Sequence, residues 1–408
     1  MNQKSSKGKS KLNNTKKEQK IDSEADNEKK DIDNKQELKT EPVHIAQIMG
    51  KWIGGGVESV IMNYYENIDR TKFQFDFICD DDSTNIPYEK IEKLGGKVIL
   101  VPPYQKVFKY IKTLKKIFKE NNYKIVHSNI NTLSVFPLYA AKKVGVPVRI
   151  AHSHSTSNKK EWKKNAVKNI LRPFSKRNAN VYFACSELAA RYLFGNKTFE
   201  EGKVTIINNA INLEKFKFNQ GKREKLRKEL KIKDDEFVVG HIGRFVSQKN
   251  HTFLIDIFNE LRKENNKAVL LLIGQGPLQD QIKEKVRELG IEDSVRFAGQ
   301  VDNASDYYNA MDVFVLPSLY EGLPVVGVEA QANGLQCYFS TDMTKETKVL
   351  KKTKFISLNE GAKKWAKNIL NEKNNRTEDT KEEMTEKGFN IIKEADKLKK
   401  IYLKIDNE

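Results

Sequence analysis

The sequence predicts an α/β protein made of two doubly wound parallel units with a cleft between them. Short apolar runs typical of strands alternate with helical patterns from residue 43 onward. This alternation favours parallel sheets whose faces are covered by helices. The chain has 408 residues, and two domains are expected because single hydrophobic cores stop growing near about 250–300 residues.

The first unit begins with an apolar strand that Gly54-Gly55-Gly56 breaks. Strands are identified by alternation or short apolar runs, and helices by apolar residues at three- and four-residue spacing. The expected strands are 43–49, 73–79, 97–101, 124–127, 148–151, 181–184 and 203–207. The expected helices are 57–68, 88–94, 105–121, 131–144, 159–177 and 186–194.

The second unit repeats the pattern. Its expected strands are 237–242, 268–273, 295–297 and 313–316. Its expected helices are 219–231, 250–264, 277–289, 303–310, 325–334, 361–371 and 383–404. We therefore place the two domains at 43–215 and 216–384, followed by a C-terminal helix at 385–408.

Residues 1–40 are Lys-rich and of low complexity, with almost no large apolar residue, which predicts a disordered tail. The tail holds 11 lysines against eight acidic residues, a net charge of +3, so most of the chain's net charge of +18 belongs to the folded part. The excess is mostly lysine, and we recognise no nucleic-acid-binding module. An anionic membrane surface is the better match for this charge.

Composition also argues against several other classes of protein. No run of about 18 apolar residues is present, so no transmembrane helix is expected. The N-terminus lacks the apolar region of a secretory signal. Cys79, Cys185 and Cys337 lie far apart and form neither a disulfide framework nor a zinc motif, which fits a reducing compartment. We expect a cytoplasmic protein, with peripheral attachment at the inner face of the cell membrane.

The strongest functional pattern is a pair of glutamates, Glu321 and Glu329, separated by a Glu-Gly-Leu-Pro turn and the start of a helix. The turn follows strand 313–316, and ligands bind at the carboxyl ends of parallel strands. Backbone N–H groups at the helix start favour a pyrophosphate. The two carboxylates can accept hydrogen bonds from sugar or ribose hydroxyls. The alternative is that they only suit the helix dipole.

Two cations are expected at the same sheet edge. Arg244 ends the first strand of the second unit, and Lys249 lies five residues further on. An arginine fork and a lysine charge can hold a leaving pyrophosphate as its negative charge develops. Solvated loop cations are the alternative. Gly274-Gln-Gly276-Pro277 is another strand–helix turn, with a weak functional signal.

Three motifs of the first unit each allow more than one interpretation. Gly54-Gly55-Gly56 lets a phosphate approach backbone N–H groups, or is a plain turn; it does not match GxGxxG. His152-Ser153-His154 follows a strand, where neutral imidazoles can bind a sugar hydroxyl or polarise a leaving group; a metal site or a structural cap is the alternative. Asp80-Asp81-Asp82 superficially matches a metal-binding DxD motif, but its polar surroundings favour a turn.

Two predicted helices are basic and amphipathic. Segment 159–177 carries eight Lys or Arg residues against one Glu, and segment 105–119 has a similar pattern. Such helices can lie on an anionic membrane. The alternative is ordinary packing of their apolar stripes on the sheet.

Together these residues resemble the retaining glycosyltransferases of family 4, which have the GT-B fold of two Rossmann-like domains. The resemblance spans about residues 43–372. It depends on Gly243-Arg244…Lys249, Gly274-Gln-Gly276 and Glu321-Gly-Leu-Pro…Glu329-Ala in the family's order and spacing. The segments RIAHSHST, YFACSELAARYLFG and VEAQANGL are similar to capsular or exopolysaccharide transferases.

The resemblance implies a role for each motif. Glu321 would contact the donor sugar, Glu329 the nucleotide ribose, and His154 would be the active-site histidine, with His152 the less favoured choice. The catalytic set implied is His154, Glu321, Arg244 and Lys249. The donor-binding set implied is Gly55, Gly56, Arg244, Lys249, Val301, Glu321, Gly322, Leu323, Pro324 and Glu329. No metal or cofactor is implied, and the C-terminal helix would cross back to the first domain.

The function implied is retaining transfer of a sugar, with a UDP-sugar the favoured donor, to a lipid-linked or glycan acceptor of surface polysaccharide or glycoconjugate synthesis. We expect front-face attack, because no carboxylate nucleophile stands at a family-defined position. A non-catalytic partner subunit, a nucleotide-sugar 2-epimerase and a nucleic-acid-binding protein are the alternatives. Two departures from the family pattern are residues 1–40 and Gln336, which stands where the family usually has proline.

Overall fold

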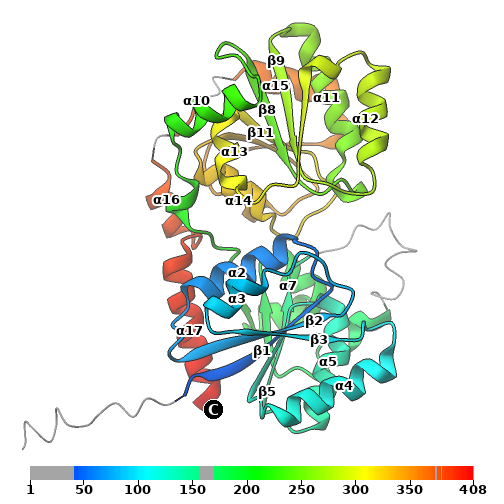
Figure 1. Ribbon diagram of the computed structural model, residues 1–408, viewed down its shortest axis with the longest axis vertical. Helices are drawn as coiled ribbons and strands as arrows, with labels where there is room; N and C mark the ends of the chain where they lie inside the picture. Colours follow the sequence, from blue (N-terminus) through cyan, green and yellow to red (C-terminus); the bar gives the residue numbers. More distant parts are fainter. Residues whose placement is uncertain (1–40, 156–169, 373–374, 378, 408) are drawn as a thin grey trace, which may run out of the picture. The chain divides into compact units, whose positions relative to one another are not determined.

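Two parallel β-sheets form the framework of the protein (Figure 1). The computed structural model describes residues 41–155, 170–372, 375–377 and 379–407. The predicted tail at 1–40 and most of the predicted helix 159–177 lie outside these residues. One sheet has seven strands in the order β3-β2-β1-β4-β5-β6-β7, and the other has six in the order β10-β9-β8-β11-β12-β13. Every pair of neighbours is parallel, which confirms the predicted fold class.

The first sheet comprises β1 (Val43–Gly50), β2 (Phe73–Asp80), β3 (Lys97–Val101), β4 (Ile125–Ser128), β5 (Val148–Ser153), β6 (Val181–Ala184) and β7 (Val204–Ile206). Its helices are α2 (Gly56–Asn67), α3 (Tyr88–Lys93), α4 (Val107–Glu120), α5 (Val135–Lys143), α7 (Glu187–Phe194) and α8 (Asn196–Glu200). Two 3-10 helices, η1 (Asn131–Ser134) and η3 (Arg172–Phe174), complete this half. Helices α4 and α5 pack against each other beside the sheet (Figure 1).

The second sheet comprises β8 (Phe237–Ile242), β9 (Ala268–Ile273), β10 (Val295–Gly299), β11 (Val313–Leu316), β12 (Gln336–Ser340) and β13 (Lys354–Ile356). Its helices are α9 (Leu213–Phe216), α10 (Gln220–Glu229), α11 (His251–Glu264), α12 (Gln279–Glu288), α13 (Ala304–Ala310), α14 (Val325–Ala332) and α15 (Gly361–Leu370). The 3-10 helix η4 (Ser247–Lys249) precedes α11. Helix α11 packs against α12 and α15, and α10 packs against α13 (Figure 1).

Successive residues of the second sheet are buried on opposite faces. Val239 and Leu270 belong to a core that also contains residues of α11 and α15. Their neighbours Val238 and Leu271 belong to a larger core, which continues into the first sheet. Because both faces are covered, these strands consist of continuous apolar runs rather than alternating ones.

The chain returns to the first sheet at its C-terminal end. The backbone N–H of Ile391 donates to the carbonyl of Ile211 over 3.0 Å, at the start of α17 (Ile391–Asn407). Helix α17 packs against α2. Its Tyr402 is fully buried, with its ring centroid 5.4 Å from that of Phe73 in β2. The last helix therefore belongs to the core of the first sheet.

A carboxylate from the second half also caps a helix of the first. Residues 43–408 form one compact unit that contains both sheets. Glu346, in the segment after β12, accepts hydrogen bonds from the backbone N–H of Glu187 at 2.9 Å and of Leu188 at 3.5 Å. These groups lie at the start of α7, where the helix dipole favours a negative charge.

Several predicted elements need correction. The single helix predicted at 383–404 is wrong: α16 (Lys381–Glu386) and α17 are separated by Gly388, whose φ of +79° ends a helix. Strands β12 and β13 and helices α8 and α9 were not predicted. The predicted helix 131–144 begins with η1. The predicted strand 148–151 extends to residue 153, so His152 lies inside β5.

Residues 172–177, at the C-terminal end of the predicted helix 159–177, do not form an α-helix. Residues 172–174 form η3 with Pro173 near its start, and residues 175–177 form a turn. A proline restricts the residue before it and disfavours a continuing α-helix. No helix among the described residues is both long enough and apolar enough to cross a bilayer.

Candidate functional site

The predicted site residues gather at the carboxyl edges of the two sheets. In each sheet the strand order reverses at one point, between β1 and β4 and between β8 and β11. Ligands bind at such points in open parallel sheets. Gly243 and Arg244 directly follow β8, and the turn at residues 321–324 connects β11 to α14. Parallel topology thus brings together motifs that lie far apart in the sequence.

Lys249 and Glu321 form an ion pair at the second of these points. Lys249 Nζ lies 2.7 Å from Glu321 Oε1, and the two side chains are only 16% and 9% exposed. Gln248 Nε2 donates to the other carboxylate oxygen, Oε2, over 3.1 Å and to the carbonyl of Tyr320 over 3.0 Å. Both oxygens of Glu321 are therefore occupied by donors from η4. Lys249, which is predicted to bind phosphate, and Glu321, which is predicted to bind sugar, are therefore in direct contact with each other.

Arg244 differs from Lys249 because it has no partner among the described residues. Its residue is exposed, and within the described residues its guanidinium makes no hydrogen bond or ion pair. The neighbouring backbone is well held: the N–H of Phe245 donates to the carbonyl of Gln275 over 3.0 Å. The arginine therefore projects from an anchored turn with all its donors available to an anion.

The turn at residues 321–324 is seated against the first sheet. A Cβ added to Gly322 would lie 2.6 Å from the carbonyl oxygen of His154, so only glycine allows this approach. Asn209 Nδ2 donates to the carbonyl of Leu323 over 2.6 Å. Ser186 Oγ donates to the carbonyl of Gly322 over 3.4 Å. These contacts bring the predicted histidine next to the predicted glutamate turn.

His154 is held rigidly and is neutral. Its backbone N–H donates to Asn131 Oδ1 over 2.7 Å, and its Nε2 lies 3.1 Å from Asn129 Oδ1. Burial lowers the pKa of His154 to about 3. Its Nδ1 is buried without a hydrogen-bond partner among the described residues. The side chain can therefore bind a polar group but is not a cation near neutral pH.

The glycine-rich loop before α2 faces the same region. A Cβ on Gly56 would lie 3.9 Å from Val325 Cγ2 at the start of α14, and one on Gly54 would lie 3.7 Å from Gln300 Nε2. Gly55 is the N-terminal cap of α2. Val301, a predicted donor-binding residue, is partly buried against the core. The loop therefore lies beside the helix start that is predicted to bind the diphosphate.

Glu329 lies in α14 and accepts a hydrogen bond from the hydroxyl of Tyr308 over 2.7 Å at Oε2. Burial raises the pKa of Glu329, and the Tyr308 hydrogen bond and the charge of Lys215 act in the opposite direction. Within the described part of the chain, Oε1 has no hydrogen-bond donor. That oxygen is the one available to a ribose hydroxyl.

Some polar partners in the site were not predicted. Tyr308 and Gln248 hold the two glutamates, and Asn129 holds His154. None belongs to a short motif, so the sequence carries no local signal for them. Asp81 and Asp82 form a turn, as predicted, and Asp82 pairs with Lys51 at 2.7 Å. In the ranges that the structure describes, no group of three or more His, Cys, Asp or Glu residues is arranged to hold a metal ion.

Comparisons with known families match this architecture over most of the chain. Residues 54–215 match the family model "Glycosyltransferase Family 4", and residues 222–390 match "Glycosyl transferases group 1". The fold and the matches define a glycosyltransferase with the GT-B fold. The chain belongs to glycosyltransferase family 4, which confirms the predicted family.

Two relatives extend over nearly the same length. The chain is 35% identical over 333 residues to the putative glycosyltransferase EpsF of Bacillus subtilis, covering 80% of this chain and 86% of that protein. It is 25% identical over 384 residues to the Escherichia coli UDP-Gal:alpha-D-GlcNAc-diphosphoundecaprenol alpha-1,3-galactosyltransferase, covering 88% of this chain and 97% of that one.

Solved structures share the fold at lower identity. Anabaena Alr3699/HepE in complex with UDP and glucose superposes with a TM-score of 0.68 and 18% identity, covering 89% of this chain and 97% of that one. Sucrose-phosphate synthase of Thermosynechococcus elongatus has a TM-score of 0.73 and 20% identity, covering 89% and 99%. These likenesses support the GT-B fold.

The contact between Gly322 and His154 predicts that Gly322→Ala disturbs the site. The added methyl group would meet a backbone carbonyl that cannot rotate away, so the turn must shift. A shift of about 1 Å in a catalytic geometry can cost about 10²-fold in rate. We expect kcat/KM for sugar transfer to fall by about that factor. Gly221→Ala in α10, where the nearest atom is the Asn219 Oδ1 at 3.4 Å, is the control and should keep full activity.

Proposed function

We propose that the protein is a metal-independent, retaining transferase that moves a sugar from a UDP-sugar to a lipid-linked or glycan acceptor in surface polysaccharide synthesis. The observation that carries this proposal is the buried Lys249–Glu321 pair beside the start of α14. Its relatives support the substrate class: the E. coli protein is named for a UDP-galactose donor and a diphosphoundecaprenol acceptor, and the staphylococcal relative CapH for capsular polysaccharide.

The diphosphate of the donor would lie between α14 and two cations. Arg244 offers a planar fork, Lys249 a point charge, and the start of α14 backbone N–H groups. Together they supply the positive charge that stabilises a leaving diphosphate. Glu329 Oε1 would accept from a ribose hydroxyl, while Tyr308 keeps the carboxylate oriented.

Donor binding would rearrange the ion pair. Lys249 neutralises Glu321 in the ligand-free protein. When Lys249 turns toward the diphosphate, Glu321 Oε1 becomes free to accept from a sugar hydroxyl. Gln248 remains on Oε2 and keeps the carboxylate in place. The carboxylate of Glu321 would therefore be neutralised by Lys249 in the absence of donor and would become free to bind the sugar once the diphosphate binds.

Chemistry at the anomeric carbon would follow a front-face path. The bond between the anomeric carbon and the diphosphate oxygen breaks, and the acceptor oxygen bonds to the same face of that carbon. The acceptor hydroxyl proton passes to the departing diphosphate oxygen. This step therefore needs no protein base. A neutral His154 fits this scheme, since it would bind a hydroxyl rather than deliver a proton.

A transfer assay tests the proposed function. UDP-glucose, UDP-galactose and UDP-N-acetylglucosamine are each offered with a polyprenyl-diphosphate-linked sugar acceptor, with and without EDTA. We expect one donor to be used, EDTA to have no effect, and proton NMR to show that the anomeric configuration is retained. Lys249→Met and Glu329→Gln should each lower kcat/KM by about 10²-fold, since each removes a charged contact. Lys225→Met, an exposed lysine of α10, is the control.

The alternatives give different results. Conversion of the donor without an acceptor would assign a 2-epimerase. UDP binding with no turnover of any donor would assign a non-catalytic partner subunit. An inverted product or loss of rate in EDTA would contradict the retaining, metal-independent mechanism.

A membrane-facing surface is a further part of the proposal. The apolar stripe of α4, which includes Tyr110, Leu114 and Phe118, is buried in the core and is not available to lipid. Phe108 on the opposite side is 92% exposed and lies among exposed lysines. Membrane contact by α4 would therefore use Phe108 and cations rather than the stripe.

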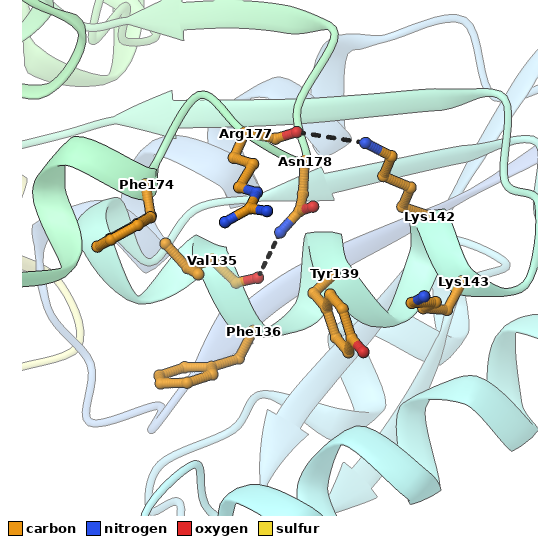
Figure 2. A pocket seen from close by; sticks show the side chains of 8 residues that line it. All are labelled: Val135, Phe136, Tyr139, Lys142, Lys143, Phe174, Arg177 and Asn178. Atoms are coloured by element: carbon orange, nitrogen blue, oxygen red, sulfur yellow. Dashed lines mark hydrogen bonds between the residues drawn. The ribbon is translucent and has the colours of Figure 1, made fainter.

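The neighbouring surface of α5 and η3 is a pocket of aromatic and basic side chains (Figure 2). Phe136, Tyr139 and Phe174 line it with Lys142, Lys143 and Arg177. The ammonium groups of Lys115 and Lys143 each lie 5.6 Å from the centroid of the Tyr139 ring. Such a combination suits the interface of an anionic bilayer, where rings and cations both bind.

Vesicle binding tests this surface. We compare vesicles of phosphatidylcholine alone with vesicles that also contain phosphatidylglycerol. Lys142→Gln with Lys143→Gln should weaken binding to the anionic vesicles by about 30-fold, at about 1 kcal/mol for each lysine. The double variant Lys225→Gln with Lys228→Gln on α10 removes the same charge elsewhere and should bind like the wild type. If both double variants lose the same affinity for the anionic vesicles, binding depends on net charge alone and the proposed surface is wrong.

A further inference from the structure

A chain of buried hydrogen bonds connects the C-terminal helix to the histidines of β5. Tyr402 of α17 places its hydroxyl 2.7 Å from His127 Nδ1 in β4. His127 Nε2 lies 3.0 Å from His152 Nδ1. All three side chains are at most 1% exposed. The ring of His152 then contacts that of His154, with centroids 3.8 Å apart and planes tilted by 36°.

A second branch returns from His154 to the same tyrosine. His154 Nε2 is 3.1 Å from Asn129 Oδ1, and Asn129 Nδ2 donates to Gln47 Oε1 over 2.9 Å. Gln47 Nε2 donates to the hydroxyl of Tyr402 over 3.4 Å. The two branches close a ring beneath the active-site histidine, with Tyr402 as the common member.

The ring determines where each imidazole carries its proton. Asn129 Oδ1 can only accept, so His154 Nε2 is protonated and Nδ1 carries a lone pair. Because Gln47 donates to the Tyr402 oxygen, the hydroxyl proton points to His127 Nδ1. His127 Nε2 must then donate to His152 Nδ1, which leaves the proton of His152 on Nε2.

A tautomer can be assigned to each ring only if the imidazole is neutral. Burial lowers the pKa of His127 to about 3 and lowers the pKa of His152 below its ordinary value, and the charges of neighbouring histidines act in the same direction. Each ring therefore carries one proton near neutral pH, and the tautomer decides whether a nitrogen donates or accepts.

Two nitrogens remain without partners among the described residues, and they are complementary. His152 Nε2 is a buried donor, and His154 Nδ1 is a buried acceptor. The other nitrogen of each ring already has a partner: His127 in β4 for His152, and Asn129, directly after β4, for His154. A hydroxyl group satisfies the pair, since its oxygen accepts from one and its hydrogen donates to the other. A carbonyl cannot donate, and an ammonium cannot accept.

We propose that Tyr402 and His127 are positioning residues that fix the tautomer of His152, so that His152 and His154 together bind a single hydroxyl of the donor sugar. The proposal rests on the proposed function and deepens it, because it names a determinant of sugar specificity. Without the Tyr402 hydroxyl, the His127–His152 bond can reverse. His152 Nε2 then becomes a second acceptor, and one hydroxyl can donate to only one of the two.

The first experiment measures tautomers in the ligand-free full chain by nitrogen-15 NMR of labelled histidine. We expect wild-type His127, His152 and His154 to be protonated at Nε2. In Tyr402→Phe the signals of His152 should show a mixture of tautomers or the Nδ1-protonated form. Tyr64→Phe is the matched control, because it also removes a buried hydroxyl, which donates to the Asn208 carbonyl over 2.7 Å. Unchanged tautomers in Tyr402→Phe would overturn the proposal, whether or not the protein transfers sugar.

The second experiment measures Kd by calorimetry for UDP-glucose, UDP-galactose and their monodeoxy analogues. One deoxy position should cost the wild type about tenfold in affinity, the value of a neutral hydrogen bond. That penalty should shrink to about twofold in Tyr402→Phe and persist in Tyr64→Phe. A penalty that survives in Tyr402→Phe would contradict the proposal. If neither nucleotide sugar binds, the donor assignment of the proposed function fails, and the tautomer measurement still decides the role of Tyr402.

Discussion

The seating of the 321–324 turn between the two sheets is the constraint on which the site depends. Glycine at position 322 lets the turn touch the backbone of His154, and Asn209 holds the carbonyl of Leu323. On its other side, Lys249 and Gln248 hold the carboxylate of Glu321. One short turn thus joins the side chains of both sheets that we propose to face the sugar. A short turn is sufficient because the carboxyl ends of parallel strands all lie at the same edge of their sheet.

The histidines do not contribute positive charge to the candidate site. Burial lowers the pKa of His154 to about 3 and of His241 to about 4, and the charge of Lys249 further disfavours a proton on His241. The positive groups of the site are therefore Arg244, Lys249, which is paired with Glu321, and the backbone N–H groups at the start of α14. In the proposed function these groups would stabilise a departing diphosphate and would leave proton transfer to the substrates themselves. This division of roles agrees with front-face transfer, in which the leaving group takes the acceptor proton.

Local patterns predicted most of the fold and the motif residues. Strand 268–273 has the predicted bounds, because a parallel strand buried on both faces consists of an apolar run. Strand 97–101 also has the predicted bounds, although it lies at the edge of its sheet and is only partly buried. Strand β12 begins with Gln336 and ends with Ser340, and β13 has three residues, so neither resembles such a run. The prediction of one helix at 383–404 is wrong because Gly388 has a φ of +79°, which ends α16 inside an otherwise helical apolar pattern. The Tyr402–His127 contact joins residues 275 positions apart and has no local signal.

The central claim is that Lys249 leaves Glu321 to contact the diphosphate of the bound nucleotide, so that the carboxylate of Glu321 can bind the sugar. A crystal structure of the protein with an intact UDP-sugar measures this directly. The account predicts that Lys249 Nζ contacts the diphosphate and that a hydroxyl of the sugar occupies Glu321 Oε1, while Gln248 stays on Oε2. An intact Lys249–Glu321 pair in a complex whose diphosphate lies away from Arg244 and α14 would contradict it.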